Sequence, residues 1–104
     1  MSRVSVADAE ARLGKVYAMG CTGLVAELLG RPYKNSHSYV QGASIGKNGV
    51  YHGVSAGDIV GFPGHVAVYV GKPGTMFIDV GGPGKACRRL ERGYGDTEVF
   101  LYSY

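Results

Sequence analysis

The sequence predicts an α+β protein with an antiparallel sheet. Two short helical patterns come first in the chain and β-rich runs follow them, an order that favours an antiparallel sheet over a doubly wound one. Of the 104 residues, 45% are hydrophobic and 18% are charged, which is ordinary for a globular chain. The 18 glycines are scattered without a period, and this indicates many tight turns between short strands. We expect one domain spanning residues 1–104.

Two short helices are expected in the first 30 residues. Ser5 precedes residues 6–14, an alanine-rich run with early acids and a closing glycine, as in a capped helix. The second run, residues 21–29, places apolar side chains at helical spacing and is stopped by Gly30. Cys21 therefore stands at the amino terminus of a predicted helix.

Four β-rich runs are expected in the second half of the chain. Residues 31–57 are mixed polar and glycine-rich, and we interpret them as an irregular connector. The later runs are rich in β-branched and aromatic residues, and glycine- and proline-containing turn signals separate the first three. The predicted strands are residues 58–62, 66–70, 76–80 and 98–102. The first three should form a meander.

Three residues in separate elements suit nucleophilic catalysis. A helix amino terminus and a nearby imidazolium both stabilise a thiolate, so Cys21 is a candidate nucleophile. His65 opens a predicted strand, a rigid place for a general base. Asp79 is an acid in an apolar run, and a hairpin turning at residues 72–75 would bring it beside His65 to orient the ring. Each residue alone also has a structural interpretation: a packed thiol, a turn histidine and an acid on an exposed strand face.

Three sequence blocks resemble the signature of the NlpC-type cell-wall cysteine peptidases. They are Gly20-Cys21-Thr22-Gly23-Leu24-Val25, Gly57-Asp58-Ile59-Val60-Gly61-Phe62 and Gly64-His65-Val66-Ala67-Val68-Tyr69-Val70-Gly71. The blocks follow the family's order, and with Asp79 they span more than half of the chain. The most specific feature is that only Pro63 separates the second block from the third.

The resemblance implies a papain-like, NlpC-type fold with the nucleophile at the start of a helix packed on an antiparallel sheet. It implies a cysteine amidase or endopeptidase that hydrolyses amide bonds of peptidoglycan stem peptides, typically the bond between D-Glu and the diamino acid. Cys21 and His65 match the family's nucleophile and base, and Asp79 matches its third polar residue. The resemblance implies no metal or cofactor.

The residues around the nucleophile are the expected substrate contacts. Tyr17 resembles the family's tyrosine that lines the cleft, and it could join the backbone N–H of Cys21 in binding an oxyanion. Gly20 and Thr22 stand where the family usually has Asp and Ser. Because that Asp commonly binds a stem-peptide amine, Gly20 predicts that a free amino-terminal L-Ala is not required.

Charge and composition bear on partners and location. A formal net charge of +3 favours an anionic partner such as the cell wall, whereas the basic residues at 85–92 suggest a solvated face rather than a nucleic-acid site. No signal peptide and no membrane span of about 20 apolar residues is visible. We expect a soluble protein, made in the cytoplasm, that reaches the cell wall without the ordinary export signal. A secreted antibacterial effector with a delivery or immunity protein, or a phage-like lysis component, would do so.

Two other functions fit the same residues. An enzyme with this triad could transfer an acyl group or deamidate a protein glutamine, acting on a protein substrate. A non-catalytic binding module could also retain the fold, in which case the thiol of Cys21 would be unreactive. The second cysteine, Cys87, lies in a different sequence context, and we expect no disulfide between the two.

Overall fold

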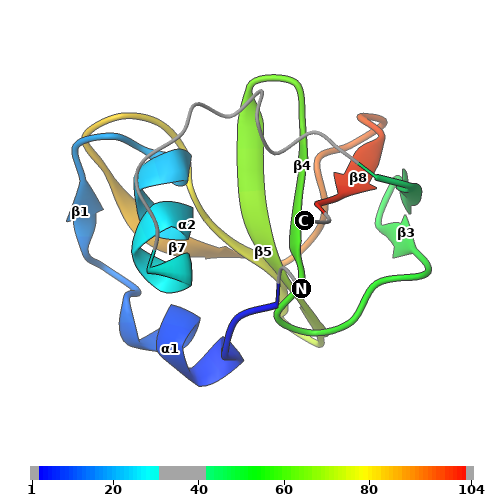
Figure 1. Ribbon diagram of the computed structural model, residues 1–104. Coiled ribbons are helices and arrows are strands. Elements are labelled where there is room, and N and C mark those ends of the chain that lie inside the picture. The colour runs from blue at the N-terminus through cyan, green and yellow to red at the C-terminus, as the bar shows by residue number, and fades with distance from the viewer. Residues whose placement is uncertain (1–2, 31–41, 103–104) are drawn as a thin grey trace.

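The computed structural model describes residues 3–30 and 42–102, and within them the chain forms two helices and an eight-stranded sheet (Figure 1). The helices are α1 (Val6–Ala11) and α2 (Cys21–Leu29). The strands are β1 (Val16–Tyr17), β2 (Ser44–Lys47), β3 (Val50–Tyr51), β4 (Ile59–Phe62), β5 (His65–Lys72), β6 (Thr75–Val80), β7 (Lys85–Leu90) and β8 (Val99–Leu101). Neighbouring strands are antiparallel, in the order β1-β7-β6-β5-β4-β8-β2-β3. No helix in the described part of the chain is long and apolar enough to cross a membrane.

The predicted α+β, papain-like fold is wrong. The protein is mostly antiparallel β-sheet, and its helices cover only six and nine residues. The prediction missed four strands: β2 and β3 form within the expected connector, and β1 pairs with β7 at the other end of the sheet. These strands are short or rich in charged and glycine residues, so their pairing depends on neighbouring strands more than on local propensity. Part of the expected connector, residues 31–41, lies outside the described residues.

Both predicted helices are confirmed. The Ser5 side chain caps α1 by accepting a hydrogen bond from the backbone N–H of Asp8 at 3.2 Å, although the helix ends at Ala11, before the expected glycine. Helix α2 begins at Cys21 and is closed by Gly30, which has a φ of 65°, in the left-handed region that glycine adopts without strain.

The four predicted strands are confirmed as β4, β5, β6 and β8, with β5 starting one residue early and running to Lys72. Alternate side chains of the sheet enter two apolar clusters, as expected when successive side chains point to opposite faces. On one face, Leu24 and Val25 of α2 pack into a cluster that includes Val66 and Val68 of β5. Both helices contribute to this cluster and lie on the same side of the sheet (Figure 1). This packing fixes the start of α2 beside the start of β5.

Candidate active site

Cys21 is the first residue of α2 and its side chain is half-buried. The N-cap residue, Gly20, has no side chain to satisfy the N–H groups of the first turn. Uncapped N–H groups give a helix start a partial positive charge, which stabilises an anion such as a thiolate. The predicted position of Cys21 at a helix amino terminus is therefore confirmed.

Gly20 is required by the backbone at this point. Its φ of 71° and ψ of −146° lie in a region that is essentially limited to glycine. A Cβ added here would lie 3.0 Å from the backbone nitrogen of Pro83 and 3.1 Å from the carbonyl carbon of Gly82. An aspartate at this position would thus be strained and crowded, which gives a structural reason for the departure from the resembled family.

His65 and Asp79 lie in direct contact. The Nε2 atom of His65 is 2.7 Å from Oδ2 of Asp79, and their side chains are 13% and 0% exposed. The two residues come from the neighbouring strands β5 and β6, as the hairpin prediction required. Since Nε2 is the ring nitrogen that faces the carboxylate, Nδ1 is the one left for Cys21, with which His65 also forms a hydrogen bond.

Two further residues, which were not predicted from the sequence, form hydrogen bonds with the carboxylate of Asp79. Arg88 donates from Nε to Oδ1 of Asp79 at 2.8 Å, and the hydroxyl of Tyr94 donates to Oδ2 at 2.7 Å. The Tyr94 hydroxyl also lies 3.2 Å from Nε2 of His65. Arg88 could have been found by pairing residues 76–80 with 85–90 around their glycine-rich turn, because Asp79 and Arg88 are cross-strand partners. Tyr94 lies in a loop and gave no such signal.

The electrostatics of the site favour ionisation of all three groups. Burial opposes the charged form of Asp79, but hydrogen bonds from His65, Arg88 and Tyr94 lower its pKa to about 2. Burial also opposes the charged form of His65, yet its contacts with Asp79 and Cys21 raise its pKa to about 9. Burial alone would raise the pKa of the Cys21 thiol. The contact with His65 and the backbone hydrogen bonds lower the pKa by more, so it lies below the ordinary value of a thiol. These shifts favour a thiolate–imidazolium pair at neutral pH.

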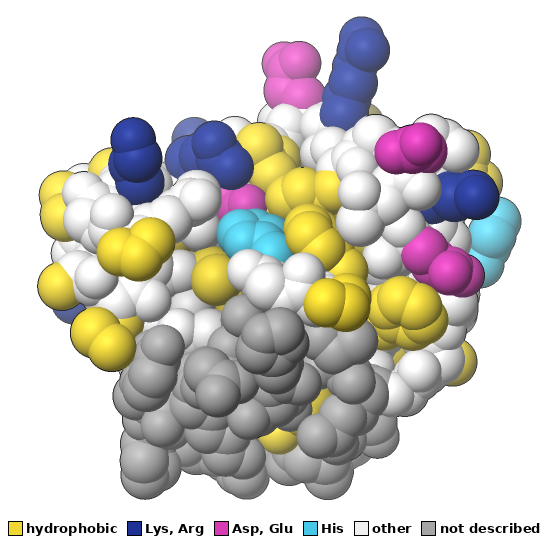
Figure 2. All heavy atoms as spheres, turned by 90° about the horizontal axis from the view of Figure 1, so that it is seen from above, with side chains coloured by type: hydrophobic (Ala, Val, Ile, Leu, Met, Phe, Trp, Pro, Cys, Tyr) yellow, Lys and Arg dark blue, Asp and Glu magenta, His cyan; other side chains and the backbone are white. Residues whose placement is uncertain are grey.

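An aromatic wall borders the histidine. The ring of His65 packs against Phe62 and Tyr94, with centroid distances of 5.4 and 5.2 Å. A cavity of about 250 Å³ opens beside these rings and is also lined by Gly81 and Arg88. Figure 2 shows a histidine ring at the surface, with acidic and basic side chains on one side and hydrophobic side chains on the other. A substrate in this cavity would reach the histidine from solvent.

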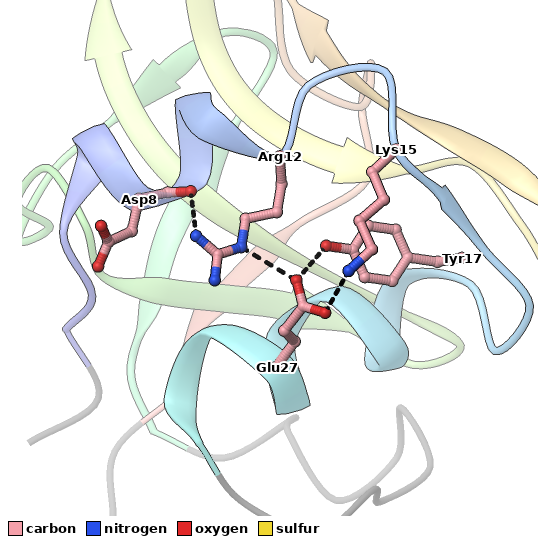
Figure 3. A network of polar contacts seen from close by, with 5 residues as sticks. All are labelled: Asp8, Arg12, Lys15, Tyr17 and Glu27. Carbon is pink, nitrogen blue, oxygen red and sulfur yellow. Dashed lines mark hydrogen bonds and ion pairs between the residues drawn. The ribbon is translucent and has the colours of Figure 1, made fainter.

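Tyr17 lies beside the first turns of α2, where a Cβ added to Gly23 would be 3.6 Å from its ring. Its hydroxyl donates to Oε2 of Glu27 at 2.5 Å, and Glu27 also binds Arg12 and Lys15 (Figure 3). Tyr17 is 6% exposed, and Nζ of Lys15 lies 5.1 Å from the centroid of its ring. In this arrangement Tyr17 joins β1 to α2, and its hydroxyl is already engaged rather than directed at an oxyanion. Its role in substrate binding stays a prediction.

Thr22 is 3% exposed, and its hydroxyl donates to the carbonyl oxygen of Met19 at 3.2 Å. Its backbone forms a hydrogen bond with the Cys21 sulfur, and this contact lowers the pKa of the thiol. Thr22 therefore supports the nucleophile through its main chain, while its side chain holds the turn before α2. Contact between Thr22 and substrate stays a prediction.

The second cysteine is outside this site. Cys87 is 3% exposed and both cysteines are free thiols, so the structure contains no disulfide between them. Burial raises the pKa of Cys87 to about 11, with a smaller contribution from the charge of Asp79. The residues in ranges 3–30 and 42–102 contain no group of three or more His, Cys, Asp or Glu side chains that could hold a metal ion.

We expect Cys21 to be alkylated by iodoacetamide at pH 6, where an ordinary thiol with a pKa of about 8.5 is almost entirely protonated. Because the pKa of Cys21 is lowered, part of its thiol stays ionised below the pKa of an ordinary thiol. The alkylation rate of Cys21 should therefore exceed that of N-acetylcysteine by about tenfold or more. Cys87 is the internal control and should react only after unfolding. Peptide mapping by mass spectrometry after timed labelling measures both rates. A Cys21 rate no higher than that of N-acetylcysteine would mean that the thiol is not activated.

Comparison of the chain with protein-family models, with curated proteins and with solved structures finds no match. The resemblance to NlpC-type peptidases therefore rests on the three sequence blocks alone and stays a prediction.

Proposed function

We propose that the protein is a cysteine amidase or endopeptidase that hydrolyses an amide bond of peptidoglycan stem peptides, with Cys21 as nucleophile. The observation that carries the proposal is the continuous chain of contacts from Cys21 through His65 to Asp79, with a cavity beside the histidine. A buried carboxylate behind a histidine, which in turn contacts a thiol at a helix start, is the arrangement that nucleophilic catalysis requires.

The first half of the reaction forms a thioester. The Cys21 thiolate attacks the carbonyl carbon of the scissile amide, and the negative charge that develops on the oxygen is met by the backbone N–H at the uncapped start of α2. His65, protonated at Nδ1, gives that proton to the nitrogen of the leaving amine as the C–N bond breaks. Asp79 stabilises the imidazolium before this transfer and keeps the ring oriented after it.

The second half of the reaction hydrolyses the thioester. Neutral His65 takes a proton from water as the water oxygen attacks the acyl carbon, and the carbon–sulfur bond breaks to release a carboxylic acid and the Cys21 thiolate. The sum is an amide plus water giving an amine and a carboxylic acid. Since the imidazolium is needed as the acid of the first half, turnover should fall as the pH rises through about 9.

The substrate assignment rests on the resemblance of the three sequence blocks and on the positive net charge of +3, which suits an anionic polymer. The bond between the side-chain carboxyl of D-Glu and the diamino acid is the proposed target. The protein would act at the cell wall.

We expect stems without a free amino-terminal L-Ala to be cleaved, because Gly20 offers no carboxylate to bind a stem amine. A charge-assisted contact of this kind is worth about 1.5 to 3 kcal/mol, and its absence removes at least a tenfold preference for the free amine. The test compares whole sacculi, free tetrapeptide and N-acetylated tetrapeptide by product mass. Cleavage of the free-amine peptide alone would show that another residue replaces the missing acid.

A further inference from the structure

We infer that Arg88 binds a carboxylate of the substrate that lies close to the scissile amide, in addition to holding Asp79. The inference deepens the proposed function and rests on it. A stem peptide linked through the side chain of D-Glu keeps its α-carboxylate free, two methylene groups and one Cα away from the amide carbonyl. Binding of this carboxylate requires a cationic side chain close to the position of the scissile amide.

The guanidinium of Arg88 is bound by Asp79 and lies beside Gly81. Its Nε atom is bound to Oδ1 of Asp79, and a Cβ added to Gly81 would lie only 3.2 Å from Cζ and Nη2. The guanidinium therefore occupies space that a side chain at residue 81 would fill, while the bond to Asp79 fixes its Nε edge. Preorganisation of this kind reduces the entropy that a ligand loses when it binds.

The same side chain borders the cavity at the histidine. Arg88 lines that cavity together with His65, and its side chain is 51% exposed although its partner Asp79 is 0% exposed. In the described part of the chain, no hydrogen bond engages the two Nη groups. A guanidinium offers five N–H donors in a planar fork, so the bond to Asp79 through Nε leaves donors for a second carboxylate.

A second basic side chain extends this surface. Arg88 also lines a neighbouring cavity of about 280 Å³, where Lys85 is another lining residue. Three positive groups, namely Arg88, Lys85 and protonated His65, therefore border adjoining cavities, while the buried Asp79 is already bound by three donors. The charge at the rim favours an anionic acyl group next to the reacting carbonyl.

The test uses two stem peptides that differ only in the α-carboxylate of D-Glu, which is free in one and a primary amide in the other. Hydrolysis of both is measured with the native protein, with Arg88→Gln and with Arg88→Lys, which keeps the charge but not the fork. Arg89→Gln is the matched control, since Arg89 is the next residue of β7, is exposed and pairs across the strand with Ile78. Binding of both peptides to Cys21→Ala, with and without Arg88→Gln, is measured by calorimetry.

We expect the native protein and Arg89→Gln to prefer the carboxylate peptide by about tenfold or more in kcat/KM, and Arg88→Gln to lose that preference. Arg88→Lys should keep part of it. If Arg88 acts only by holding Asp79, both peptides lose activity by the same factor in Arg88→Gln, which overturns the inference while the proposed function stands. If the native protein cleaves neither peptide, the proposed function fails. Equal binding of the two peptides to Cys21→Ala overturns the inference whatever the hydrolysis result.

Discussion

The Cys21→Ala protein is expected to fold normally and to lose stem-peptide hydrolysis almost completely. Cys21 is the group that would bond to the acyl carbon, and removing a nucleophile from a catalytic triad costs on the order of 10⁶-fold in turnover. The fold should survive because the side chain is half-buried at the start of α2, while the helix is anchored by the fully buried Leu24 and Val25. Release of new amines from peptidoglycan measures the loss, and circular dichroism measures the fold.

The matched control is Cys87→Ala. Cys87 is buried on β7 and takes no part in the proposed reaction, so its replacement should lower the melting temperature slightly and leave turnover near the native value. Undiminished hydrolysis by Cys21→Ala would end the covalent mechanism. Equal losses in both variants would show that the effect comes from destabilisation.

Replacing His65 is expected to be nearly as damaging as replacing Cys21. In His65→Ala the thiol loses the contact that lowers its pKa, and the leaving amine loses its acid. Asp79→Asn should cost less, on the order of 10⁴-fold, because orienting the base contributes less than the base itself. The asparagine still fills the site, and Arg88, which is half-exposed, remains solvated.

The order of the two losses is the test. Steady-state kcat/KM on a defined stem peptide at pH 7 should fall further for His65→Ala than for Asp79→Asn. The reverse order would mean that the roles of base and orienting group have been assigned wrongly. Melting temperatures of both variants separate lost chemistry from lost structure.

The contact between His65 and Asp79 could be predicted from sequence because it depends on one local hairpin. Turn residues at 72–75 and two β-rich runs fix the pairing of β5 with β6, and a rigid strand pair needs few other parts of the chain. The approach of Cys21 was predicted from the resemblance, and it depends on the packing of α2 against β5. Local patterns and the family resemblance together predicted that Cys21, His65 and Asp79 lie in one site.

Arg88 and Tyr94 were not predicted, because their contacts with Asp79 become visible only once strands and loops are placed. Strand β7 has exposed residues on both sides of the buried Cys87, so its pattern is that of a solvated face until Asp79 is placed opposite Arg88. Tyr94 reaches Asp79 from a loop whose path is set by tertiary contacts. The same cause explains part of the wrong fold class, because two of the missed strands, β1 and β2, pair with strands that are distant in sequence, β7 and β8.

The most direct test of the central claim is mass spectrometry of purified muropeptides incubated with the native protein and with Cys21→Ala. The native protein should convert a stem peptide into two fragments whose masses sum to that of the substrate plus one water, with the new amine on the diamino acid. The Cys21→Ala protein should leave the substrate intact. Unchanged muropeptides after incubation with folded native protein, or the same fragments from Cys21→Ala, would contradict the account.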